Sequence, residues 1–157
     1  AHNLGSVPGC IIVKRTDTAG NWQVYHNGLT SAAYSIQLNS TAAQTSATTV
    51  WNSTAPTSTV FSVGTDATVN ASGGTYVAYL FAHNAGGFGL TGTDNVISCG
   101  SFTTDGAGTV APVNLGYEPQ WLLYKDTQSS TDYWYILDVI YLCCNVIRVT
   151  IESTIAL

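Results

Sequence analysis

The sequence predicts an all-β fold, an antiparallel β-sandwich of the jelly-roll or lectin-like kind, on three observations. Short runs of β-branched and aromatic residues are separated by turn signals about every 8–12 residues, as in sandwiches and barrels. Ser and Thr account for 36 of the 157 residues, and neither is a strong helix former. No stretch combines a helical period with caps, and the nearest candidate, residues 40–49, is rich in Thr.

The expected strands are residues 10–13, 22–26, 34–38, 60–63, 76–82 and 147–152. The polar stretch 16–21 between the first two has the composition of a hairpin turn. Residues 34–38 alternate apolar and polar side chains, which is typical of a half-buried strand. Residues 76–82 are nearly all apolar, which predicts a central strand that is buried on both faces.

One segment of the chain occurs twice. The matching stretches are 4–8 with 115–119, 11–14 with 122–125, and 22–26 with 134–138. This pattern predicts a β-sandwich unit over 1–114, the start of a second copy of the repeat over 115–138, and a divergent terminal strand region over 139–157. Two interpretations of the second copy stay open, because its strands either complete the same sandwich or begin another. Because the chain contains no Met, we also expect a processed product or a segment of a longer polypeptide.

Charge and hydropathy exclude two classes of partner. The formal net charge is −5, with only four Lys and Arg, whereas a nucleic-acid or anionic-membrane surface needs clustered basic residues. The most apolar stretch, 133–147, is interrupted by Asp138 and Asn145. It is also shorter than the roughly 20 residues that a membrane-spanning helix requires. We therefore expect no nucleic-acid binding and no membrane insertion.

The chain has four cysteines, at Cys10, Cys99, Cys143 and Cys144. Their spacing matches no zinc-binding pattern, so we expect no metal site and no cofactor. Two interpretations stay open. The thiols are either buried free cysteines that act as small apolar side chains, or partners in a disulfide, for instance between Cys10 and one of the adjacent pair, or between chains.

The sequence contains no recognisable catalytic motif, so we expect no catalytic residues and no enzymatic activity. His2, His26 and His83 stand outside any nucleophile motif. Most of the Asp residues lie in turns rich in Gly, Ser and Thr, where their carboxylates are expected to accept hydrogen bonds from nearby backbone. They are Asp17, Asp66, Asp94, Asp105 and Asp132. A pair of these carboxylates in a cleft would indicate glycan hydrolysis instead.

Aromatic residues are the remaining candidates for a binding site. Those that we expect to contact a glycan or a protein partner are Trp22, Trp121, Tyr133, Trp134 and Tyr135. The alternative is that most of them fill the core of the sheet. Because side chains alternate along a strand, Trp134 should face away from both of its Tyr neighbours, so one side of that strand meets solvent or a partner.

Three blocks of sequence resemble a known family. The blocks are residues 11–26, which begin Ile-Ile-Val-Lys-Arg-Thr-Asp-Thr-Ala-Gly-Asn-Trp, residues 51–64 and residues 70–82. In that order they resemble a domain of the tail-fibre-like structural proteins of marine bacteriophages, notably cyanophages. The resemblance implies a β-sandwich module of a virion appendage and carries no catalytic or binding residues with it. Residues 139–157 depart from the pattern.

These observations lead to one expected function and two alternatives. We expect a non-enzymatic structural module of a phage tail fibre or another extracellular or virion appendage, which serves assembly and host-surface attachment. Its partners would be copies of itself, in a trimer or a filament, and a host-surface glycan or protein, with the terminal region 139–157 adding to a neighbour's sheet edge. The alternatives are a lectin-like carbohydrate-binding module and a glycan depolymerase.

Overall fold

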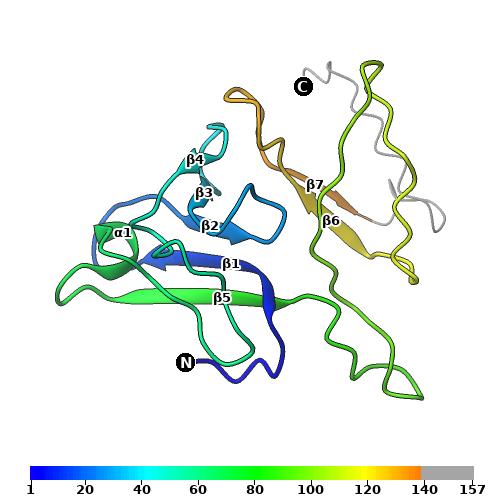
Figure 1. Ribbon diagram of the computed structural model, residues 1–157, viewed down its shortest axis with the longest axis horizontal. Coiled ribbons are helices and arrows are strands. Elements are labelled where there is room, and N and C mark those ends of the chain that lie inside the picture. Colours follow the sequence, from blue (N-terminus) through cyan, green and yellow to red (C-terminus); the bar gives the residue numbers. More distant parts are fainter. Residues whose placement is uncertain (139–157) are drawn as a thin grey trace. The chain divides into compact units, whose positions relative to one another are not determined.

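The computed structural model describes residues 1–138 (Figure 1). The chain divides into two compact units, of which the first comprises residues 1–100 and 124–134. Among the described residues, the second comprises 101–123 and 135–138. The expected strand 147–152, Cys143, Cys144 and the role of residues 139–157 lie outside the described part of the chain.

The first unit is a five-stranded antiparallel sheet with the strand order β4-β3-β2-β1-β5. Its strands are β1 (Pro8–Arg15), β2 (Gln23–His26), β3 (Tyr34–Gln37), β4 (Thr45–Ser46) and β5 (Tyr76–Ala82). The expected hairpin is present, since Ile12 lies opposite Val24 in the β1–β2 pair. The all-β prediction is confirmed, since the described chain has a five-stranded antiparallel sheet and a second sheet, which is consistent with a sandwich-like fold.

Strand β5 lies at the edge of this sheet, beside the interior strand β1, so the prediction of a doubly buried central strand over 76–82 is wrong. Ile11, Ile12 and Val13 are consecutive buried residues, which requires cover on both faces of β1. Within residues 1–138, β5 pairs only with β1, and its Ala78 and Tyr79 are exposed. An apolar run shows that a segment is hydrophobic. Whether that segment becomes a central or an edge strand depends on whether another part of the chain pairs with its second side.

One face of the sheet is covered by the long connection between β4 and β5. Its buried cluster consists of Ile11, Val13, Tyr25, Val50, Trp51 and Val69. The Trp51 ring meets Tyr25 edge to face, with the ring centroids 6.1 Å apart. The predicted strand 60–63 is wrong, because these residues pair with no strand of the described chain. Phe61 and Val63 nevertheless pack against the cluster, which accounts for the apolar pattern.

Helix α1 (Ala67–Asn70) is a single turn within this connection. The Asp66 carboxylate caps it by accepting a hydrogen bond of 2.8 Å from the backbone N–H of Thr68. Gly64 lies so close to the Thr49 carbonyl that a Cβ at position 64 would overlap it. The connection can therefore lie against the sheet only with glycine at this position.

The opposite face carries a smaller cluster of Ile12, Val24, Leu29 and Ile36. Trp22 and Trp134 both pack against this cluster. Trp134 also donates its indole N–H to the backbone carbonyl oxygen of Gln37. Since these two tryptophans occupy equivalent positions in the repeat, one residue from each copy covers the same face of the sheet.

The second sheet consists of β6 (Trp121–Tyr124) and β7 (Tyr135–Asp138). Each copy of the repeat thus forms a pair of strands, and β7 lies at the positions that correspond to β2. The two copies also share a backbone conformation, because the equivalent residues Gly5 and Gly116 have positive φ angles of 72° and 76°. The division at 114 and 115 stays a prediction. No helix within residues 1–138 has the length and apolar character that a membrane crossing requires.

Candidate functional site

A stacked aromatic pair stands on the more open face of the first sheet. Trp22, just before β2, stacks with Tyr79 of β5 at a centroid separation of 6.5 Å and an interplanar angle of 22°. The Lys14 ammonium of β1 lies 6.0 Å from the centroid of the Trp22 ring, within cation–π range. Tyr79 is 47% exposed, so solvent reaches this pair.

Two amide side chains adjoin the indole. The backbone N–H of Trp22 donates to Asn39 Oδ1 at 3.0 Å, and Asn39 Nδ2 donates to Asn21 Oδ1 at 3.1 Å. An aromatic face bordered by amide donors and acceptors is the chemistry that binds sugar rings, whose C–H face stacks while their hydroxyls form hydrogen bonds. We call Lys14, Asn21, Trp22, Asn39 and Tyr79 the Trp22 surface.

Of the other predicted aromatic contacts, Tyr133 and Trp134 belong to the first unit, and Trp121 and Tyr135 belong to the second. Trp134 is half-buried against the small cluster, whereas Tyr133 is 70% exposed. Tyr135 is also exposed, so Trp134 alternates with its neighbours as expected. Trp121 is exposed in the second unit. Within this surface, the sequence predicts Trp22 as a contact but not Tyr79, because the apolar pattern of residues 76–82 predicts a buried strand there.

A second candidate surface is the apolar segment, residues 85–97, which sequence reasoning also missed. It turns back on itself through backbone hydrogen bonds between Phe88 and Asp94 and between Gly87 and Gly92. Leu90, in the turn, is fully exposed. The other exposed large apolar side chains of the segment are Phe88, Val96 and Ile97. The available signal was the pattern of large apolar residues isolated among glycines.

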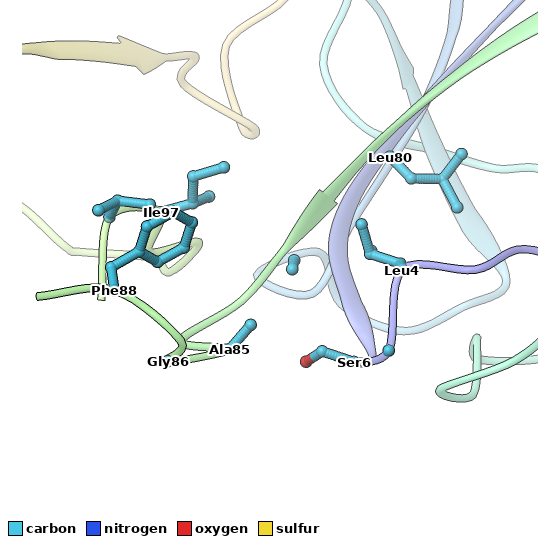
Figure 2. A pocket seen from close by; sticks show the side chains of 10 residues that line it. Leu4, Ser6, Leu80, Ala85, Gly86, Phe88 and Ile97 are labelled. Atoms are coloured by element: carbon cyan, nitrogen blue, oxygen red, sulfur yellow. The ribbon is translucent and has the colours of Figure 1, made fainter. Parts of the chain in front are cut away.

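The apolar segment borders a hollow of about 430 Å³. Figure 2 shows Phe88 and Ile97 on one side of it and Leu4 and Leu80 on the other. Ser6 supplies the one polar side chain of the lining, which contains neither a carboxylate nor an imidazole. This hollow therefore suits an apolar side chain better than a sugar, and it offers no pair of carboxylates for glycoside hydrolysis.

Cys10 and Cys99 are free thiols, as in one of the two interpretations of the cysteines. Burial raises the pKa of Cys10 to about 12 and that of Cys99 to about 11, so both stay protonated near neutral pH. His83 Nδ1 accepts a hydrogen bond from the backbone N–H of Cys99, which gives this histidine a structural partner. Within residues 1–138, no group of three or more His, Cys, Asp or Glu is placed to hold a metal ion.

Several carboxylates stabilise turns, as predicted. Asp17 forms a two-pronged ion pair with Arg15, with bonds of 2.8 and 2.9 Å, and also accepts from the backbone N–H of Thr75. The hydrogen bond from Arg15 is the main reason that the pKa of Asp17 lies well below its usual value. Asp105 accepts from the backbone N–H groups of Ala107 and Thr109. The carboxylates of Asp17 and Asp105 thus form hydrogen bonds that hold the turns and the strand ends around them.

Fold and surfaces together define an antiparallel all-β domain with exposed aromatic and apolar patches. A family model matches residues 1–155, and the chain belongs to that family, which is described as a domain of unknown function (DUF7483). Neither the curated proteins nor the solved structures include a match to the chain.

Proposed function

We propose that this domain is a non-enzymatic structural module that associates with copies of itself in an extracellular or virion appendage, such as a phage tail fibre. The observation that carries the proposal is the apolar segment, in which four large apolar side chains are exposed on one short stretch. Contiguous exposed apolar groups mark interaction sites in soluble proteins, because their hydration is unfavourable.

The physical chemistry of the chain favours association with like chains. Only 8% of the residues are charged, so two identical surfaces repel each other weakly. Burial of a fully exposed side chain such as Leu90 contributes roughly 1.5–3 kcal/mol. The adjoining hollow accepts a side chain of this kind without an unpaired charge. Apolar contacts of this size become strong when they are multiplied along an assembly.

The repeat supports the appendage part of the proposal. A chain that builds the same pair of strands twice is suited to tandem arrays, in which each module contacts its neighbours. The resemblance of residues 11–26, 51–64 and 70–82 to tail-fibre-like domains agrees with a virion or extracellular location. In such an array, many weak contacts would supply attachment to a host surface.

Sedimentation equilibrium tests the proposal. The 16.5 kDa chain should sediment as oligomers. The double variant F88S/L90S should weaken them, with a rise of about tenfold or more in the dissociation constant Kd. Val60→Ser is the matched control, since Val60 is exposed but lies outside the apolar segment. A monomeric wild-type chain at millimolar concentration would overturn the proposal, and so would equal effects of the two changes.

Carbohydrate binding is a second candidate function, and the Trp22 surface favours it. The exposed Tyr79 ring, which stacks with Trp22, offers an aromatic face for a sugar ring. The Asn39 amide next to Trp22 offers hydrogen bonds for the sugar hydroxyls. Titration with a panel of neutral oligosaccharides should give a saturable signal that Tyr79→Ala abolishes. Tyr133→Ala, which removes a more exposed tyrosine, should leave it intact. Equal binding by both variants would reject this site.

A further inference from the structure

Within residues 1–138, strand β5 has a free edge. β5 has seven residues and pairs with β1 on one side, while no strand of residues 1–138 pairs with its other side. Figure 1 shows β5 as a long strand that runs beside β1 at the border of the sheet. Ala78 and Tyr79, near its middle, are exposed. A sheet edge of this kind presents unpaired backbone donors and acceptors.

The hydrogen-bond phase of β5 shows which backbone groups face outward. Thr16 donates its N–H to the Thr75 carbonyl at 2.9 Å, and the register continues unbroken to the pair Cys10–Phe81. Hydrogen-bonded pairs recur at every second residue of an antiparallel ladder. The backbone groups of Val77, Tyr79 and Phe81 therefore point toward β1. Those that point away from the sheet belong to Tyr76, Ala78, Leu80 and Ala82.

The outward edge is complementary to itself. In a two-fold antiparallel pairing centred on Tyr79, Ala78 lies opposite Leu80 of the second copy, so a small side chain meets a large one. Tyr76 likewise lies opposite Ala82. Both are hydrogen-bonded positions, and all four of these residues carry outward N–H and C=O groups. Tyr79 then faces its own counterpart at a non-hydrogen-bonded position, where cross-strand aromatic pairs are closest and contribute most.

Nothing in β5 opposes such a pairing. Natural edge strands are protected by Lys, Pro, bulges or inward-pointing charges, whereas residues 76–82 contain no charged residue and no proline. The one irregularity of the β1–β5 ladder lies at its far end, between Pro8 and Cys10. A charged edge would repel its own copy, so the absence of charge specifically permits a like partner.

We propose that β5 pairs with β5 of a second copy of this chain, so that one antiparallel sheet continues across a two-fold axis. The inference rests on the proposed self-association and specifies one of its interfaces. A two-fold contact closes on itself. Growth beyond a dimer would therefore need a second contact, for which the apolar segment is available.

Ala78→Pro tests the pairing. Proline removes the outward N–H of residue 78, and because that N–H does not point toward β1, the bonds of the β1–β5 ladder are kept. Ala78→Thr is the matched control, since it keeps the N–H at the same exposed position. In sedimentation equilibrium we expect Ala78→Pro to raise the dimer Kd at least about tenfold and Ala78→Thr to leave it within a few-fold.

Hydrogen exchange on the wild-type chain gives a second test that needs no variant. The amides of Ala78 and Leu80 should become protected as protein concentration rises, while the Tyr79 amide, bonded to β1, should be protected at every concentration. If oligomers persist in Ala78→Pro, and if the Ala78 amide of the wild-type chain exchanges rapidly at every concentration, the β5 pairing is wrong and self-association stands. If the wild-type chain is a monomer, both the β5 pairing and the proposed self-association are wrong.

Discussion

Trp134 donates its indole N–H to the backbone carbonyl oxygen of Gln37 at a distance of 2.9 Å, across 97 residues of sequence. The bond joins a residue of the second copy of the repeat to β3 of the five-stranded sheet. The ring of Trp134 also packs on the cluster of Ile12, Val24, Leu29 and Ile36. A residue predicted to contact a ligand thus contributes to the cohesion of the first unit.

Replacement of Trp134 should therefore lower stability. Trp134→Phe keeps an aromatic ring but loses the hydrogen bond, at a cost of about 1 kcal/mol. Trp134→Ala also loses the apolar contact, and for a half-buried ring we expect roughly 2–3 kcal/mol. Urea unfolding measures both values. Tyr133→Ala is the control and should stay within about 0.5 kcal/mol of the parent, so equal losses for Tyr133→Ala and Trp134→Ala would contradict this role.

Gly64→Ala should be among the most damaging small substitutions. The added methyl group would overlap the backbone carbonyl of Thr49, and neither segment can move without displacing Val50 and Trp51 from the core. We expect a loss of about 2 kcal/mol or more in the free energy of unfolding. Gly100→Ala has open space around it and should be nearly neutral. Comparable midpoints in thermal unfolding of the two variants would refute the argument.

Asp66→Ala should remove the cap of α1 and cost about 1 kcal/mol. The Asp66 carboxylate accepts from the backbone N–H of Thr68 and from its hydroxyl, and alanine offers no acceptor. Asp66→Asn keeps a side-chain oxygen and should recover most of the loss, which chemical denaturation can measure. If the Asn variant is as unstable as the Ala variant, the negative charge rather than the cap is what matters.

The local parts of the fold could be predicted from the sequence. The hairpin of β1 and β2 follows from two β-rich runs and the polar turn between them, all within residues 10–26. The order of strands could not be predicted, because it depends on pairings between distant segments. β5 pairs with β1 although residues 16–75, which include three other strands and α1, separate them in the sequence. The apolar character of residues 76–82 does not distinguish a central strand from an edge strand.

For the candidate site too, one part could be predicted from the sequence and another part could not. Trp22 could be predicted because it is a large aromatic residue between Asn21 and Gln23, directly after the polar turn 16–21, but its partner Tyr79 could not. The two rings meet because the β1–β5 register places Tyr79 opposite Ile12, while Trp22 packs on the same face as Ile12. In the apolar segment, the isolation of Phe88 and Leu90 among glycines is the only local signal, and the exposure of these side chains also depends on which distant segments pack on them.

Acid should destabilise the first unit through His26. Burial, followed by the nearby His83, lowers the pKa of His26 in the folded chain, and His26 Nδ1 accepts the backbone N–H of Gly28 at 2.9 Å. The unfolded chain, with an ordinary value of about 6.5, then binds more protons than the folded chain just below that pH. The free energy of unfolding should therefore fall as pH drops from about 7 to 5.

Two measurements check this expectation. An NMR titration of the His26 ring should give a midpoint below the ordinary value for histidine. The slope of unfolding free energy against pH should be smaller in His26→Gln than in the parent, because glutamine has no proton to gain in that range. A normal midpoint, or an unchanged slope in the variant, would assign the acid sensitivity to groups other than His26.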